Sequence, residues 1–108
     1  MTENDRIAIA ARMHVALRRK TGRVTDTEWM AVDVDYAAEL VRLARAWAAE
    51  HGDDDLAAIA TSLEAAMEPL AIEARVRAAL HQAEERVDEQ AGPGAARRPW
   101  SRYLRGSR

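Results

Sequence analysis

The stretch from Asp33 to His51 constrains the fold most, because its apolar residues recur with the period of an α-helix. At about 100° per residue, large apolar side chains gather on one side of the stretch and charged ones on the other. The apolar side holds Tyr36, Leu40, Leu43, Ala44 and Trp47, and Ala37, Val41 and Ala48 extend it. Asp33 or Asp35 suits the N-cap, and Gly52 suits a left-handed stop. This pattern predicts an amphipathic helix over 34–51.

The remainder of the chain also favours helices. Thr2 with Asp5 forms a plausible cap, and Gly22 suits the end of a first helix, over 3–20. Thr25-Asp-Thr-Glu28 matches a capping box and predicts a short helix over 26–31. Asp53 is the expected N-cap of a helix that follows, with Asp54 and Asp55 in its first turn, where negative charge is favoured. Strand-forming residues never alternate over a useful run.

Pro69 interrupts the last helical region. One apolar stripe runs from Leu56 to Leu70, and a second runs through Ile72, Val76, Ala79, Leu80, Ala83 and Val87. On a common helical wheel the two stripes differ by roughly 145°. The simplest solution is a break or strong kink near residues 68–70 that places Pro69 in the first turn of a new helix. The other is one long kinked helix, with one half buried in its own domain and the other against a partner chain.

These patterns predict an all-α fold, a small bundle of four main helices plus one short helix. The expected ranges are 3–20, 26–31, 34–51, 54–68 and 70–90. The composition of Ala91-Gly-Pro-Gly-Ala-Ala96 is that of a linker. We therefore expect a helical domain over 1–90, followed over 91–108 by this linker and a flexible basic tail.

The composition predicts a thin core. The chain has 24 alanines and no phenylalanine, and alanine favours helix while burying little apolar area. Helices of this kind pack closely or share burial with a second subunit, so a homodimer is one expectation. The absence of cysteine excludes disulfides and thiol catalysis. No apolar run has the length of a membrane span, and the N-terminus lacks a signal-peptide pattern, so a cytoplasmic location is expected.

No catalytic or metal-binding pattern is present in the sequence. His14, His51 and His81 lie in separate elements without a ligand at a convincing spacing. No serine lies in a nucleophile elbow, and no glycine-rich loop follows a strand. We expect no catalytic residue, no metal and no cofactor, and an enzyme is the least favoured reading. A helix-turn-helix reading of 25–51 is also weak, because its recognition helix would begin with acidic residues.

The tail concentrates positive charge and aromatic residues. Beyond residue 90 the chain has five arginines and no acid, whereas residues 1–90 carry 11 basic and 18 acidic residues. The candidate partner-binding residues are Arg97, Arg98, Trp100, Arg102, Tyr103, Leu104 and Arg105. Three uses remain open: docking into a partner's groove as a short helix, binding a polyanion such as nucleic acid or an anionic membrane, and folding back onto the acidic body.

The aromatic residues of the central region have two possible roles. Trp29, Tyr36, Leu40, Leu43 and Trp47 form either core or a groove for a ligand. With core preferred, the expected function is a non-catalytic adaptor or regulatory module that binds another protein. The alternative is a nucleic-acid-associated regulator that uses the tail and the basic cluster between Arg12 and Arg23.

Overall fold

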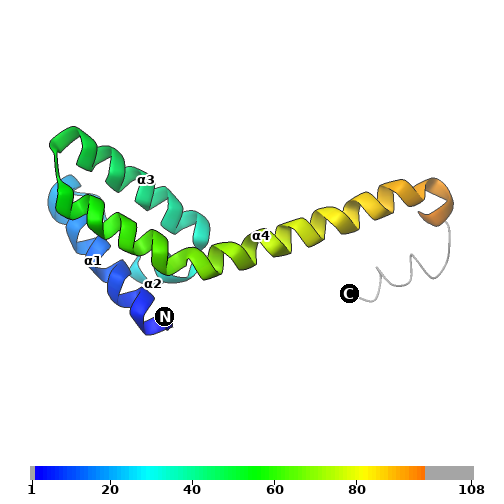
Figure 1. The fold of residues 1–108 in the computed structure, drawn as a ribbon, viewed down its shortest axis with the longest axis horizontal. Helices are drawn as coiled ribbons and strands as arrows, with labels where there is room; N and C mark the ends of the chain where they lie inside the picture. The colour runs from blue at the N-terminus through cyan, green and yellow to red at the C-terminus, as the bar shows by residue number, and fades with distance from the viewer. Residues whose placement is uncertain (1, 97–108) are drawn as a thin grey trace. The chain divides into compact units, whose positions relative to one another are not determined.

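The computed structural model describes the backbone of residues 2–96 and the side chains of residues 2–88. This part of the chain is 90% helical and has no strand, which confirms the all-α prediction. Its helices are α1 (Glu3–Thr21), α2 (Thr27–Val32), α3 (Val34–His51) and α4 (Asp54–Ala96) (Figure 1). The bundle arrangement and the basic tail remain predictions.

The chain divides into two compact units, residues 1–73 and residues 74–108. Unit 1 contains α1, α2, α3 and the first part of α4, and unit 2 begins inside α4. The division into a helical domain over 1–90 and a tail over 91–108 remains a prediction from sequence. The backbone of α4 also continues as helix to Ala96, through the segment whose composition is that of a linker.

The ends of α1 follow the expected chemistry. The backbone N–H of Asp5 donates to Thr2 Oγ1 over 3.2 Å, and the backbone N–H of Thr2 donates to Asp5 Oδ2 over 2.9 Å. This reciprocal pair is a capping box, which satisfies amides that have no partner inside the helix. At the other end Gly22 has φ 78°, a left-handed conformation that glycine adopts without steric cost.

The start of α2 differs by one residue from the expected capping box. Asp26, not Thr25, is the N-cap, and its Oδ1 accepts from the backbone N–H of Trp29 over 2.9 Å. Thr25 is instead buried, and its hydroxyl is hydrogen bonded to Nδ1 of His14 over 2.8 Å. Asp33 ends α2 and also caps α3, since its Oδ1 accepts from the N–H of Tyr36 over 2.8 Å.

A tight turn joins α3 to α4. Gly52 has φ 62°, and the N–H of the next residue, Asp53, donates to the carbonyl of Ala48 over 2.9 Å. Asp53 then accepts from the N–H of Leu56 over 3.0 Å, which makes it the N-cap of α4, as the sequence predicts. The three consecutive aspartates therefore start a helix.

The core of unit 1 draws on all four helices. Its largest fully buried side chains are Met13, Leu17, Met30, Leu40, Leu56 and Leu63. Alanines complete it: Ala10, Ala16, Ala31, Ala37, Ala44, Ala48 and Ala60. Small side chains let helices approach closely but bury little area each, so each large residue carries a greater share of the hydrophobic stabilisation.

Pro69 does not end the helix. The expected division into helices over 54–68 and 70–90 is wrong, because both are one element, α4; of the two alternatives left open at Pro69, the structure has the continuous helix. Proline removes one backbone hydrogen bond and its ring crowds the preceding turn, a cost of about 3 kcal/mol in a helix interior. The side chain of Pro69 is exposed, so the position carries that cost without contributing to the core.

Candidate functional site

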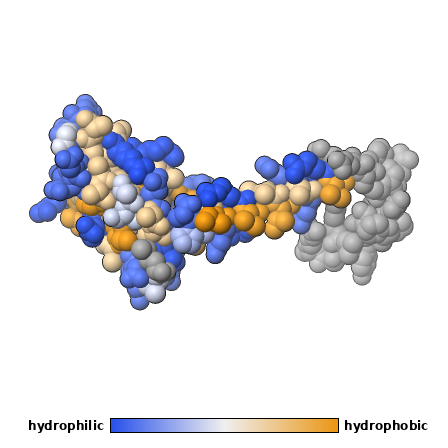
Figure 2. Space-filling model, in the orientation of Figure 1, coloured by the Kyte–Doolittle hydropathy of each residue, from blue (hydrophilic) through white to orange (hydrophobic). Residues whose placement is uncertain are grey.

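The clearest candidate site is an exposed apolar stripe on the part of α4 that belongs to unit 2. Val76, Leu80 and Val87 are 52%, 60% and 63% exposed, and Ala83 between them is half-buried. We call these four residues the α4 stripe; Figure 2 shows hydrophobic surface along this part of the helix. Their spacings of four, three and four residues alternate as in the seam of a coiled coil.

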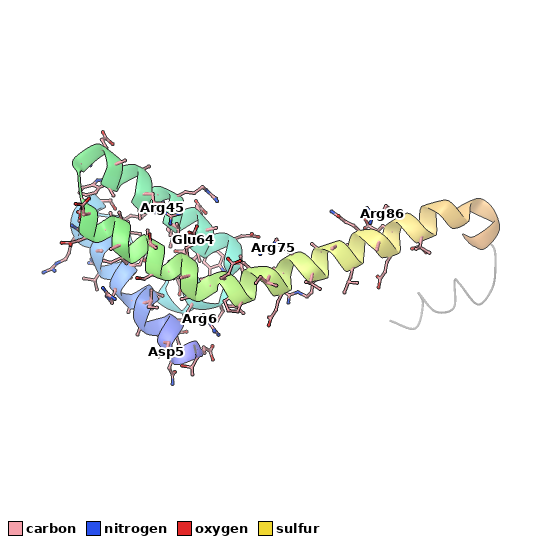
Figure 3. All side chains as sticks on the ribbon, in the orientation of Figure 1. Asp5, Arg6, Arg45, Glu64, Arg75 and Arg86 are labelled. Atoms are coloured by element: carbon pink, nitrogen blue, oxygen red, sulfur yellow. The ribbon has the colours of Figure 1, made fainter. Side chains whose placement is uncertain are left out.

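Charged residues border the stripe on both sides. At about 100° per residue, Arg77 and Glu84 lie together on one flank, and Arg86 lies on the other. Figure 3 labels Arg86 among the side chains of α4. On the side away from the stripe, His81 Nε2 lies 3.0 Å from Glu85 Oε1, an exposed pair one turn apart. An apolar seam between charged flanks is typical of a helix that packs against another helix.

Trp29 forms a second apolar surface, on unit 1. Its ring stacks on Tyr36 with centroids 4.0 Å apart and planes 12° from parallel. The hydroxyl of Tyr36 accepts from the backbone N–H of Asp26 over 3.0 Å, which holds the tyrosine ring in place. Trp29 is nevertheless 50% exposed, so it lies outside the core. Tyr36 and Leu43 pack against the core from its edge, and Leu40 is fully buried.

An open hollow of about 370 Å³ lies beside Trp29. Its lining combines apolar and acidic side chains: Glu3, Ile7, Asp26, Glu28, Trp29 and Val32. Among the described residues no basic side chain lines it, so this lining favours a positively charged or apolar group over an anion.

Trp47 lies in a different environment from Trp29. Its ring stacks on His51, with centroids 3.8 Å apart, and the ammonium of Lys20 lies 5.9 Å from the Trp47 ring centroid. Lys20 also forms an ion pair with Asp53. The open hollow beside Trp47, of about 400 Å³, is lined by Trp47, His51 and 52–55. The hollows beside Trp29 and Trp47 share no lining residue, so these two hollows are separate.

Two ion pairs on unit 1 link neighbouring helices. Arg45 of α3 donates from both Nη atoms to the carboxylate of Glu64 on α4, each over 3.0 Å (Figure 3). This hydrogen bond lowers the pKa of Glu64 below its ordinary value. The pKa of Asp53 is also lowered, first by its hydrogen bond with Lys20 and then by the backbone N–H of Leu56. Glu64 therefore links α4 to α3, and Asp53 links the start of α4 to α1.

The basic cluster of unit 1 is partly neutralised by acids. Of its members, Lys20 pairs with Asp53, and Arg23 Nη2 lies 3.8 Å from Glu39 Oε1. Arg12, Arg18 and Arg19 are exposed on α1. A cluster whose charges pair with carboxylates of the same chain is a weaker attractant for phosphates than its residue count indicates.

Each histidine has a different contact. His14 bonds to Thr25, His51 stacks on Trp47, and His81 pairs with Glu85. Within the described residues, no three histidine or carboxylate side chains are grouped as a metal site. No described helix is both long enough and apolar enough to cross a membrane.

The candidate residues of the tail lie outside the described part of the chain. They are Arg97, Arg98, Trp100, Arg102, Tyr103, Leu104 and Arg105. Their role in binding stays a prediction from sequence.

Comparison with known proteins gives no relative. No family model, no curated protein and no solved structure matches this chain. The candidate site therefore stands on the residues alone. Sequence reasoning did not name the α4 stripe among the site residues, although it offered this half of the helix as a face for a partner chain, because the apolar residues change direction across Pro69.

Proposed function

We propose that this protein is a non-catalytic protein–protein interaction module of the adaptor or regulatory type. The exposed α4 stripe carries the proposal. Three large apolar side chains, Val76, Leu80 and Val87, are each more than half exposed on one side of a helix. Contiguous apolar surface with a polar border is typical of a protein-binding face, whereas single exposed apolar residues are ordinary.

The chemistry of the stripe favours a helical partner. Aliphatic side chains at alternating three- and four-residue spacing interlock with the side chains of a facing helix, and charges beside the seam select the partner. A nucleic acid fits this face less well, because the centre of the face is aliphatic and Glu84 on its flank would repel phosphates. The tail remains a second contact predicted from sequence alone.

Site-specific photo-crosslinking in cells tests the proposal. A photoreactive phenylalanine analogue replaces Val76 in the stripe or, as a matched control, Ala78. Ala78 is exposed on the same turn but lies about 160° away around the helix. We expect a protein adduct from position 76 and little or none from position 78. Equal adduct formation at both positions, or none at either, would overturn the proposed binding face.

A further inference from the structure

We propose that the α4 stripe binds the same stripe of a second copy of this chain, with the two helices antiparallel. This inference rests on the proposed function and names its partner. The evidence is the order of charges along the part of α4 in unit 2.

Charge along this segment is segregated. Residues 74–81 contain Arg75 and Arg77 and no acid. Residues 82–88 contain Glu84, Glu85 and Asp88 against a single base, Arg86. The first half therefore has a surplus of two positive charges and the second half a surplus of two negative charges. Two copies placed in parallel would bring like charges together, whereas antiparallel copies bring opposite charges together.

The seam specifies a register for this pairing. A two-fold axis between residues 81 and 82 places Leu80 beside Ala83 of the second copy and Val76 beside its Val87. Leu80, which is large, then faces the small Ala83, and Val76 faces a valine of equal size. This combination fills the seam without a clash. Because the axis is two-fold, the Leu80–Ala83 pair and the Val76–Val87 pair each occur twice in the interface.

The flank adds specific pairs in the same register. On this flank Arg77 lies about 3 Å along the helix axis from Glu84 of the second copy, within reach of a long side chain, and the symmetry repeats this pair; Arg86 of the second copy, which is level with Arg77, lies on the other flank. Within one chain the two residues are nearly two turns apart, about 10 Å along the helix, so they are not an intrahelical pair. A parallel arrangement places Arg77 of one copy and Glu84 of the other on opposite flanks of the seam, so it does not form this pair.

The interface is short. Residues 74–88 span about 22 Å of helix, which is at the small end for protein interfaces. The expected Kd is therefore on the order of 10 μM or weaker. Sedimentation of the full chain from about 1 μM to 500 μM is expected to show a reversible shift from monomer to dimer.

A charge exchange tests the pairing. We expect Arg77→Glu and Glu84→Arg each to weaken dimerisation at least about tenfold, and the double variant to restore it. Ala78→Glu, on the opposite face, is the control and leaves the dimer unchanged. Circular dichroism confirms that each variant keeps its helical content. A double variant as weak as the singles would overturn the pairing.

The absence of cysteine from the sequence permits a test of orientation. Val76→Cys and Val87→Cys chains, mixed under mild oxidation, are expected to form a disulfide-linked heterodimer. Neither chain alone is expected to link, because equivalent residues are about 16 Å apart along the antiparallel axis, beyond disulfide reach. Linkage of Val76→Cys with itself would show a parallel pair and overturn the inference.

The two proposals fail separately. A chain that stays monomeric to 500 μM, yet forms an adduct with a different protein from position 76, would overturn self-pairing and leave the interaction module standing. A chain that dimerises as described, with adducts of twice its mass, supports both.

Discussion

Replacing leucine by alanine at two places on α4 distinguishes its packed and exposed parts. Leu63 is fully buried in the core of unit 1, and Leu80 is 60% exposed in unit 2. Both lie inside the same helix, so the small change in helix propensity is the same for both. The difference between the two variants therefore measures burial.

The expected magnitudes follow from the exposed fractions. Leu63→Ala removes a wholly buried side chain and leaves a cavity, and its cost is about 3 kcal/mol in free energy of unfolding. Leu80→Ala removes a side chain that stays largely in water, so its cost in the monomer is about 0.5 kcal/mol or less. For a unit of this size the first change lowers the melting temperature by roughly 12–24 °C.

Urea unfolding measures both free energies. The protein is kept at low micromolar concentration, below the expected dimer Kd, so that the monomer is measured. A Trp100→Phe background leaves Trp29 and Trp47, both in unit 1, as the fluorescent probes. Circular dichroism follows total helix in parallel. The reasoning would be refuted if Leu63→Ala cost less than about 1 kcal/mol, or if the two variants were equally destabilised.

Three further predictions concern the ends, the interior and the charges of the helices. Pro69→Ala restores a backbone donor inside α4 and is expected to raise helicity and stabilise by up to about 3 kcal/mol; no gain by circular dichroism and urea unfolding would show a break there. Gly52→Ala adds a Cβ that no neighbouring atom crowds, but the left-handed backbone at φ 62° disfavours a side chain. We expect the free energy of unfolding to fall by about 1–2 kcal/mol, measured by thermal unfolding. Glu64 has a lowered pKa because it accepts a hydrogen bond from Arg45, so its contribution to stability is complete above the unfolded value, near 4.5, and is lost as pH falls through the folded value. Glu64→Gln is expected to reduce the loss of stability between about pH 6 and pH 3; an unchanged pH profile would contradict this.

Local patterns predicted the helices of unit 1 well. The stops at Gly22 and Gly52 and the caps at Asp33 and Asp53 depend on residues within a few positions of each other. The one shift was at α2, where Asp26 replaces Thr25 as the cap. Thr25 is bonded instead to His14, which lies on another helix, and no short-range pattern reveals such a contact.

Pro69 shows where local reasoning fails. Both a break and a continuous helix satisfy the apolar pattern, and the choice depends on what each half of α4 packs against. Sequence assigns the apolar residues to two directions but does not show that Val76, Leu80 and Val87 remain exposed. The sequence therefore predicted the spacing of the apolar residues of the candidate site but not their exposure to solvent. The core-or-groove candidates of the central region show the same limit, since Trp29 is half-exposed and Leu40 is buried.

The turns of unit 1 have a consequence for how quickly it acquires its structure. Gly22 and Gly52 close their helices, and Asp26, Asp33 and Asp53 open the next ones, all through bonds between near neighbours. Little search is needed to reverse the chain direction at these points, because loop closure over a few residues takes about 10–100 ns. Helical proteins rich in such short-range contacts reach the native state in microseconds to milliseconds. Unit 1 should therefore complete its core soon after its last residues leave the ribosome.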